Sequence, residues 1–416
     1  MVDKNLFLHD LAVVSILKNE GPYLKEWLDY HLMADVDHFY LYDNESPDNQ
    51  AEVVKPYVDA GLVDYISAPG KHMQMKAYND AANRFKFQSR YMAFIDGDEF
   101  IFPKSNRSVV EVVDEILPNY PDAAGLAVNL HNFGSNGEET ADYSRGVLER
   151  FTRRAPSDWA PNGMGNAHVS TIANPRMINY LTIPHFAFYF EGVHAINENG
   201  GIVPSAFNNP VTDKKIVMNH YSVKSREEYA KKVNRGAADH NTYYMENFLP
   251  NDTNEEFDDG ILRYRAERAK VYKSPDKSRA DEKLLNALMI NLSPTLLPTT
   301  PLTFYAGKME TFLTCRAVSE YLSKRITNDA PTKFFEEAAL TAIFKTLFGG
   351  MNFADMRLLI RELPALLRLP YPVVKDLRNA VLQIIPQMME VMKTSSLWRE
   401  FMELGYIQDL LKTFKE

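Results

Sequence analysis

The chain of 416 residues is long enough for roughly two or three domains, and its hydrophobic content of 45% excludes a wholly disordered chain. Its 46 basic and 55 acidic residues give a formal charge of -9, which argues against binding along the phosphates of a nucleic acid. Because Cys315 is the single cysteine and no apolar run reaches the length of a signal peptide or a membrane span, we expect no intrachain disulfide, no Cys-rich zinc site and a soluble cytoplasmic protein.

The first third of the chain alternates predicted strands with predicted helices. Short apolar runs rich in β-branched and aromatic residues predict strands at 11–17, 38–42, 63–66, 91–95 and 123–130. Amphipathic spacing predicts intervening helices at 23–32, 51–60, 73–87 and 108–117. This alternation predicts an α/β fold with a mostly parallel sheet covered on both faces. Right-handed crossovers would place the carboxyl ends of the strands at one edge of the sheet.

Capping residues mark several of the expected helix boundaries. Ser46 followed by Pro47 suits the N-cap and the first residue of the second helix, and Gly61 suits its end. Ser108 and Glu111 have the spacing of a capping box at the start of the fourth helix. These signals predict where the polypeptide enters and leaves the helices.

Three acidic residues follow the strand predicted at 91–95. Asp96, Asp98 and Glu99 fall within four consecutive positions. Carboxylates crowded at the end of a buried strand repel one another, and a divalent cation such as Mg²⁺ or Mn²⁺ is a suitable counter-charge. An exposed acidic turn explains the same residues equally well at this point.

Polar clusters also follow two other predicted strands. Lys18, Asn19 and Glu20 come after the first strand, and Asp43 and Asn44 come after the second. Ligands bind at the carboxyl ends of strands in open α/β sheets, so clusters at three such ends favour a ligand site over scattered loop chemistry. The sequence has neither a Gly-x-Gly-x-x-Gly motif nor a P-loop, which leaves a nucleotide held by carboxylates and a metal.

Several motifs in one order resemble a single enzyme family. The segments 15–31, 37–46, 94–101, 133–137, 184–186 and 219–229 together resemble family-2-like glycosyltransferases allied to family 92. The resemblance implies a GT-A fold and metal-dependent transfer of a sugar with inversion of configuration. It also implies a nucleotide-sugar donor, UDP-linked, and a glycan or lipid-linked glycan acceptor in surface or capsular polysaccharide synthesis.

The resemblance further implies a metal site. Asp96 and Asp98 form the Asp-x-Asp pair that would hold Mn²⁺ or Mg²⁺ on the donor diphosphate. His220, which follows a strand predicted at 216–218, would be the third ligand, and an imidazole favours Mn²⁺. The alternative for His220 is a hydrogen-bonded histidine at a strand end. Glu99 is expected to turn away from the metal or to support the acidic pair.

Donor contacts are implied at further positions. Glu20 and Asp43 resemble the acids that face the base and ribose of the nucleotide, and Gln74 opens the helix before the acidic stretch. A second capping box at 225–228 places Lys224 beside a helix N-terminus, where it would meet a phosphate. The implied donor-binding residues are Lys18, Asn19, Glu20, Asp43, Gln74, Asn79, Asp96 and Lys224.

An inverting enzyme needs a general base, and the spacing of residues does not select one. Polar segments between the acidic pair and His220 supply the candidates, which are His131, Glu138, Asp158 and Glu191. Retention of configuration would need no such base. The sequence departs from the expected pattern at Ser170, where relatives would carry a lysine, so the resemblance implies no phosphate-binding role at this position.

The remainder of the chain has a different pattern. We expect a GT-A domain over residues 1–265, a proline-punctuated linker over 266–305 and an all-α bundle over 306–416, outside the resemblance. A basic helix is expected at 261–272. The bundle would stabilise the enzyme, form a homo-oligomer interface or dock the protein to membrane-bound polysaccharide machinery at the inner face of the membrane.

Two other functions remain open from the sequence alone. A degenerate glycosyltransferase-like chain would act as a binding or scaffold protein through its helical module. A metal phosphohydrolase would instead hydrolyse simple phosphate esters. The intact Asp96, Asp98 and His220 favour an enzyme over a scaffold.

Overall fold

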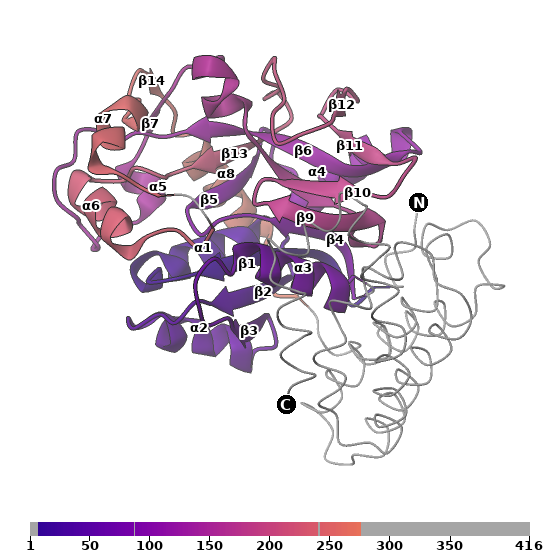
Figure 1. Cartoon of the computed structure of the whole chain (residues 1–416), viewed down its shortest axis with the longest axis horizontal. Helices are drawn as coiled ribbons and strands as arrows, with labels where there is room; N and C mark the ends of the chain where they lie inside the picture. The colour runs from indigo at the N-terminus through magenta and orange to yellow at the C-terminus, as the bar shows by residue number, and fades with distance from the viewer. Residues whose placement is uncertain (1–6, 87, 240–241, 276–416) are drawn as a thin grey trace, which may run out of the picture. The chain divides into compact units, whose positions relative to one another are not determined.

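A computed structural model describes residues 7–86, 88–239 and 242–275 (Figure 1). Nearly all of these residues belong to the first of two compact units, Asp3–Ala82 with Gln88–Ala280. The predicted linker lies outside the described residues from residue 276 on, and so does the whole bundle predicted at 306–416.

A mixed sheet forms the centre of the described unit (Figure 1). Neighbouring strands follow the order β12-β11-β6-β8-β4-β1-β2-β3, and β13 pairs with both β6 and β5. Strands β1, β2, β3, β4, β6, β11 and β13 run in one direction, against β5, β8 and β12. The predicted α/β class with a mostly parallel sheet is therefore confirmed. The strands of this sheet are β1 (His9–Leu17), β2 (His38–Asp43), β3 (Val63–Ser67), β4 (Ser89–Phe94), β5 (Glu99–Pro103), β6 (Ala123–Asn132), β8 (Val169–Ala173), β11 (His194–Ile196), β12 (Ile202–Val203) and β13 (Ile216–His220).

The sheet departs from a simple alternation of parallel strands at β8 and at β5, a strand that the sequence did not predict and that pairs antiparallel with β13. Every strand expected from the sequence is present, but β8 inserts antiparallel between β4 and β6. This strand comes from a segment that follows β6 in the chain, so local periodicity could not predict its partners. Two short ribbons complete the strands, β9 (Ile178–Ile183) with β10 (Phe186–Tyr189) and β7 (Arg153–Arg154) with β14 (Glu256–Phe257).

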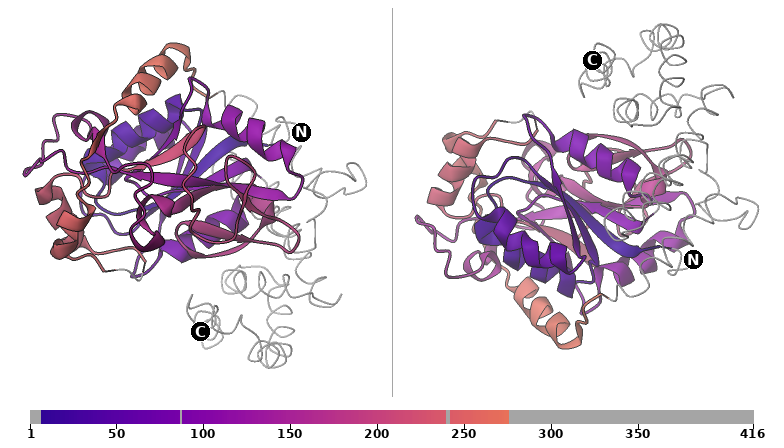
Figure 2. Two further views of the ribbon diagram at one scale, coloured as in Figure 1. Left: turned by 90° about the horizontal axis from the view of Figure 1, so that it is seen from above. Right: turned by 90° about the horizontal axis from the view of Figure 1, so that it is seen from below.

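Helices cover both faces of the sheet (Figure 2). Helices α1, α2, α4 and α8 share a core with Leu11, Val13 and Leu17 of β1, which point to one face because side chains alternate along a strand. On the other face the ring of Tyr78 from α3 lies 5.4 Å from that of Phe94. The helices are α1 (Gly21–Met33), α2 (Gln50–Asp59), α3 (Gln74–Arg84), α4 (Val109–Ile116), α5 (Val147–Arg150), α6 (Arg226–Arg235), α7 (Phe248–Asn251) and α8 (Gly260–Val271), with 3₁₀ turns at η2 (Leu117–Asn119), η3 (Pro161–Gly163), η4 (Gly165–Ala167), η5 (Pro175–Met177) and η6 (Met245–Asn247).

Both predicted capping boxes are confirmed, at Ser108 for α4 and at Ser225 for α6. The predicted N-cap at Ser46 is wrong, because α2 begins at Gln50 after Asn49. The Ser46 hydroxyl instead accepts a hydrogen bond from the backbone N–H of Asn19 at 3.1 Å. The segment after β2 therefore ties down the loop that follows β1 rather than starting a helix at once.

Helix α8 confirms the basic helix expected at 261–272 and continues past the boundary predicted at residue 265. Ile261 and Tyr264 are buried in the main core. Arg268 Nε donates to the carbonyl oxygen of Met33 at the end of α1, at 3.0 Å. The helix is therefore packed as part of the same unit as the sheet.

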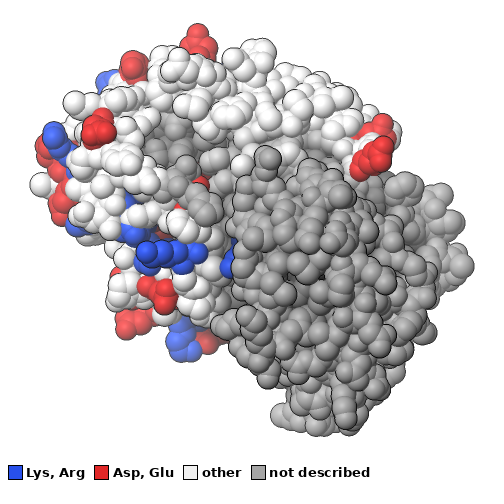
Figure 3. All heavy atoms as spheres, viewed as in Figure 1, with Lys and Arg blue, Asp and Glu red and all other residues white. Residues whose placement is uncertain are grey.

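On the face drawn in Figure 3, Lys and Arg side chains lie among Asp and Glu side chains rather than in a continuous basic band. None of the helices between residues 7 and 275 combines the length and apolar composition needed to cross a bilayer.

Candidate functional site

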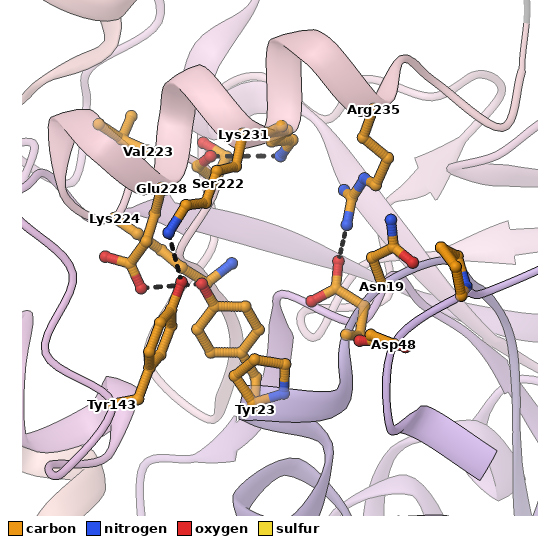
Figure 4. A pocket seen from close by; sticks show the side chains of 14 residues that line it. Asn19, Tyr23, Asp48, Tyr143, Ser222, Val223, Lys224, Glu228, Lys231 and Arg235 are labelled. Atoms are coloured by element: carbon orange, nitrogen blue, oxygen red, sulfur yellow. Dashed lines mark hydrogen bonds and ion pairs between the residues drawn. The ribbon is translucent and has the colours of Figure 1, made fainter.

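Two adjoining clefts open at the carboxyl edge of the sheet. The larger cleft, of about 720 Å³, is lined by residues that follow β1, β2 and β4 and by His220 at the end of β13. The smaller cleft, of about 410 Å³, is lined by residues of α6 and of the loop before α1 (Figure 4). Glu20, Ser222, Lys232 and Arg235 line both clefts. The loops that the sequence places at this edge therefore meet there.

Asp96 lies in the larger cleft and is held by neutral hydrogen-bond donors. Its Oδ1 accepts from Gln74 Nε2 at 2.8 Å and from the Tyr78 hydroxyl at 3.2 Å. Burial and the neighbouring charge of Asp98 raise the pKa of Asp96 to about 6. Asp96 forms no ion pair with the residues described, so its carboxylate would be stabilised by a cation.

Asp98, two residues further on, lies against Lys232 and His220. Lys232 Nζ donates to Asp98 Oδ2 at 2.8 Å, and His220 Nε2 lies 3.5 Å from Asp98 Oδ1. Burial raises the pKa of Asp98, but Lys232 and His220 lower it well below its usual range. Asp98 is therefore an anion at neutral pH.

The imidazole of His220 is oriented by Asn132. Because the Asn132 Oδ1 is an acceptor 3.0 Å from His220 Nδ1, this nitrogen carries the proton and donates it to the amide oxygen. The other ring nitrogen, Nε2, faces Asp98 Oδ1, so the imidazole and this carboxylate could together hold a cation through Nε2 and Oδ1.

These residues fit a divalent cation that is shared with a ligand. In the described part of the chain, no three His, Cys, Asp or Glu side chains converge closely enough to hold an ion by themselves. Mg²⁺ and Mn²⁺ are commonly bound by one or two carboxylates together with substrate phosphates and water. Asp98 and His220, with Asp96 beside them, match that kind of site rather than a closed cage of protein ligands.

Glu99 is buried behind the acidic turn and is hydrogen-bonded to it. Its Oε2 accepts from the backbone N–H of Asp96 at 3.2 Å and from Ser170 Oγ at 2.9 Å. Burial, followed by the charges of Asp96 and Asp98, raises the pKa of Glu99 well above its usual range. Ser170, where the family resemblance implies a lysine in relatives, thus holds a buried carboxyl group in place.

The predicted donor-binding residues are divided between the clefts. Lys18, Gln74 and Asp96 line the larger cleft, Asn19 and Lys224 line the smaller one, Glu20 lines both, and Asp43 and Asn79 line neither. Asp43 Oδ1 accepts from Gln50 Nε2 at 3.0 Å. Asn79 pairs with the backbone of Leu181 through both ends of its amide. These two side chains hold α2 and α3 in position.

Lys224 is a buried cation at the edge of the smaller cleft. Its side chain is 6% exposed, its φ angle is +53°, and its Nζ lies 4.5 Å from the centre of the Tyr23 ring. Within the described residues its ammonium group forms no hydrogen bond or ion pair. The N–H groups at the start of α6 are already paired with Glu138, Glu139 and the capping box, so they are not available to an anion.

Of the acids that line the smaller cleft (Figure 4), Glu228 and Glu20 have cationic partners, whereas Asp48 accepts from the backbone N–H groups of Gly21 and Gln50. Glu228 accepts from Arg150 at 2.8 Å and 3.0 Å and from the Tyr23 hydroxyl at 2.8 Å. Burial raises the pKa of Glu228, but Arg150, Ser225 and Tyr23 lower it to about 2. Glu20 forms an ion pair with Arg235. Among the cations that line the smaller cleft, Lys224 alone forms no ion pair with a described residue.

None of the four candidates for the general base lines either cleft. His131 is buried and its Nε2 lies 3.1 Å from Asp213 Oδ2, and Glu138 forms an ion pair with Arg150. Asp158 and Glu191 are exposed to solvent elsewhere. Polar composition selected these residues, but a base must lie within reach of the substrate.

Two histidines that the sequence did not suggest as bases line the larger cleft instead. His168 comes just before β8, and His185 lies in the turn between β9 and β10, with ring centres 5.4 Å apart. Burial lowers the pKa of both imidazoles, to about 3 for His185. His185 could have been identified from the motif at 184–186. Lys232 and Arg235 could have been identified as cleft residues because their spacing of three places them on one face of α6.

The profile of glycosyltransferase family 92 matches residues 15–257, which is more than half of the chain. This chain belongs to glycosyltransferase family 92. The match covers the acidic turn, the histidines of the larger cleft and all of α6. The described domain, an α/β unit with a mostly parallel sheet, agrees with the GT-A fold that the motifs led us to expect.

Curated relatives share part of the sequence with this family member. A glycosyltransferase family 92 protein of Ricinus communis is 25% identical over 233 residues, which are 55% of this chain and 38% of that protein. The galactan beta-1,4-galactosyltransferase GALS2 of Arabidopsis thaliana is 29% identical over 110 residues, 24% of this chain and 21% of that protein. The chain therefore spans well under half of the length of these relatives.

A solved structure that aligns with most of this chain is that of S. aureus TarS 1-349 in complex with UDP. It is 11% identical, the alignment covers 83% of this chain and 93% of TarS, and the TM-score is 0.31. At this TM-score the likeness carries no weight for fold or function.

Proposed function

We propose that this family 92 protein is a metal-dependent glycosyltransferase that moves a sugar from a nucleotide-sugar donor to a glycan acceptor with inversion of configuration. The observation that carries the proposal is the arrangement of Asp98 and His220, whose acceptor atoms face each other 3.5 Å apart beside Asp96 in a 720 Å³ cleft. Mn²⁺ or Mg²⁺ bound there would neutralise the charge on the departing diphosphate.

The residues around the cleft support binding of the donor. Lys18, Glu20 and Gln74 come from the loops that bind ligands at the carboxyl edge of an open α/β sheet. Lys224 offers an unpaired ammonium group in the adjoining space. A nucleotide diphosphate needs both a cation and basic side chains, and the two clefts supply these within one edge of the sheet.

His168 is the general base in this proposal. Its Nδ1 lies 3.3 Å from the carbonyl oxygen of Gly165, so Nδ1 donates its proton there and the lone pair of Nε2 is available for an acceptor hydroxyl. Burial lowers the pKa of His168, which keeps the ring neutral at physiological pH. His185, with a pKa of about 3, is the weaker proton acceptor of the two.

The acceptor class rests on the relatives. GALS2 is named as a galactosyltransferase acting on galactan, and we extend from it to a polysaccharide acceptor of the surface or capsular kind. UDP-linked sugars are the first donors to test, because the motifs of the sequence resemble enzymes that use them.

A donor panel tests the proposed function. Purified protein is heated with Mn²⁺ and each of several UDP-, GDP- and CMP-sugars, and the unfolding midpoint is recorded. One donor class should raise the midpoint in the native protein and leave Asp98→Asn unchanged, because a ligand that binds the folded state stabilises it. If every nucleotide-sugar leaves the native midpoint unchanged with Mn²⁺ and with Mg²⁺, the protein is a family 92 binding or scaffold protein.

A further inference from the structure

The closest cation to the acidic turn is a lysine of the protein itself. Lys232 lies in the last turn of α6, and its Nζ donates to Asp98 Oδ2 at 2.8 Å and to the Ser222 carbonyl oxygen at 3.2 Å. The side chains of Lys232 and Asp98 are 13% and 8% exposed. An ion pair so little exposed to water is screened weakly by salt.

The charges around Asp98 make Lys232 its counter-ion. Arg235, one turn further along α6, is engaged with Glu20 and with the Lys18 carbonyl oxygen. Lys224 lies over the ring of Tyr23 and forms no ion pair with a described residue. Burial lowers the pKa of Lys232, but Asp98 raises it well above the usual lysine range, so the ammonium is charged.

Lys232 also borders two spaces. It lines the larger cleft beside Asp98 and the smaller cleft beside Lys224 and Arg235. Its four-carbon stem can move the ammonium group between neighbouring anions, whereas a guanidinium group would be held in a more fixed geometry. An anion placed between the clefts lies within reach of this side chain.

We propose that Lys232 is a displaceable counter-ion. Its ammonium group pairs with Asp98 while no divalent cation is bound, and it moves to the donor diphosphate when a cation takes its place on Asp98. The inference rests on the proposed function. A divalent cation on Asp98 and an ammonium group hydrogen-bonded to the same carboxylate repel each other, so binding of one weakens binding of the other. The diphosphate supplies the negative charge that then attracts the released ammonium group.

This role predicts effects of opposite sign on two ligands. Removing the ammonium group takes away the competitor of the metal, so Mn²⁺ alone should bind more tightly. The same change takes away a partner of the diphosphate, so UDP should bind more weakly once Mn²⁺ is saturating. A lysine that only stabilised the fold of the site would weaken the binding of both ligands when it is removed.

The test uses Lys232→Met, with Lys232→Arg to keep the charge and Lys55→Met as a matched control. Lys55 is exposed, pairs with Asp59 and lines neither cleft. Free Mn²⁺ is measured by electron paramagnetic resonance without nucleotide, and UDP binding is measured by calorimetry at saturating Mn²⁺.

In Lys232→Met the dissociation constant of Mn²⁺ should fall about threefold or more, and that of UDP should rise about tenfold. Lys232→Arg should keep UDP binding close to that of the native protein, and Lys55→Met should change neither constant. Tighter Mn²⁺ binding with weakened UDP binding supports the exchange. Mn²⁺ binding that is unchanged or weaker in Lys232→Met overturns it.

The failure of this inference can be told apart from the failure of the proposed function. If Asp98→Asn binds Mn²⁺ and UDP as well as the native protein does, the metal site itself is wrong. If Asp98→Asn loses both ligands while Lys232→Met does not shift them in opposite directions, only the exchange by Lys232 is wrong. Unfolding midpoints of each variant show whether it is folded before binding is measured.

Discussion

The two clefts of this family 92 protein differ in how their charges are balanced. In the larger cleft Asp96 has neutral partners and Asp98 shares one ammonium group with Ser222. In the smaller cleft Glu228 is neutralised by Arg150, Asp48 accepts from backbone N–H groups, and Lys224 is the cation that forms no ion pair with a described residue. One cleft therefore has acids that attract a cation, and the other has a buried cation that attracts an anion. A metal-bound diphosphate carries both kinds of charge and matches the two clefts together.

Asp98→Asn removes a carboxylate from the larger cleft and should have the largest effect of these variants. The amide cannot hold a cation as a carboxylate does, and it leaves Lys232 buried without its counter-ion. We expect kcat/KM for Mn²⁺-dependent hydrolysis of the donor to fall about 10³-fold. Initial rates of nucleotide release measure it, with Asp59→Asn on the exposed side of α2 as the control. Rates within a few-fold of the native enzyme would place the metal elsewhere.

Arg150→Met removes the ion pair that neutralises Glu228 in the smaller cleft. Arg150 is 2% exposed and holds Glu228 through two nitrogens, so its loss leaves a buried carboxylate without a cation. We expect the free energy of unfolding to fall by about 3–5 kcal/mol in urea denaturation. Arg145→Met, at an exposed position in the same segment, serves as the control. A loss within the error of that control would mean that solvent or another group compensates Glu228.

His168→Gln removes the proposed base while it leaves the charges of both clefts in place. We expect kcat for donor hydrolysis to fall about 10²-fold with little change in the KM of the donor. Burial lowers the pKa of His168 below that of an ordinary imidazole, and His185 and His220 are the titratable groups around it. The native kcat should therefore be constant near pH 7 and fall as the pH drops through this lowered pKa, when the base becomes protonated.

The pH profile of the variant distinguishes a base from a residue that only packs. In His168→Gln the acidic limb of the kcat profile should disappear. A variant that loses activity but keeps the native acidic limb assigns the proton transfer to another group.

Lys224→Met removes the unpaired cation of the smaller cleft and should have the smallest effect of these four variants. UDP affinity at saturating Mn²⁺ should fall about tenfold. The folded protein should become more stable by about 1 kcal/mol, because a buried ammonium group without a partner is costly. Thermal unfolding and calorimetry measure the two effects. A lower unfolding midpoint would show that Lys224 supports the fold rather than the ligand.

Local features of the sequence predicted local structure well. The strand ends, the helices between them and the capping boxes at Ser108 and Ser225 depend on neighbouring residues, and the structure confirms them. The predicted start of α2 is wrong because of a long-range contact. The Ser46 hydroxyl accepts a hydrogen bond from the backbone N–H of Asn19, a residue 27 positions away. A cap is predictable only when its side chain stays within its own helix.

The candidate site was predictable only where one short segment supplies it. The acidic turn Asp96 to Glu99 is a single stretch, whereas its counter-ion Lys232 lies 134 positions from Asp98 in the sequence. The candidates for the base were chosen by polar composition, and exposed Asp158 shows that polarity does not place a residue in a cleft. His168 precedes β8, which pairs with β4 and β6, and His185 lies in the turn of the β9–β10 ribbon. Both histidines therefore reach the larger cleft through strand pairing between distant segments, which local sequence patterns do not reveal.

The central claim is that a cation and a nucleotide diphosphate bind this protein together. Calorimetric titration of the native protein with UDP, once with Mn²⁺ and once with EDTA, tests it most directly. We predict that UDP binds at least about tenfold more tightly with Mn²⁺ than with EDTA, because Asp98 and His220 hold the ion and the ion holds the diphosphate. Equal affinity for UDP under both conditions would contradict the proposed metal-dependent function.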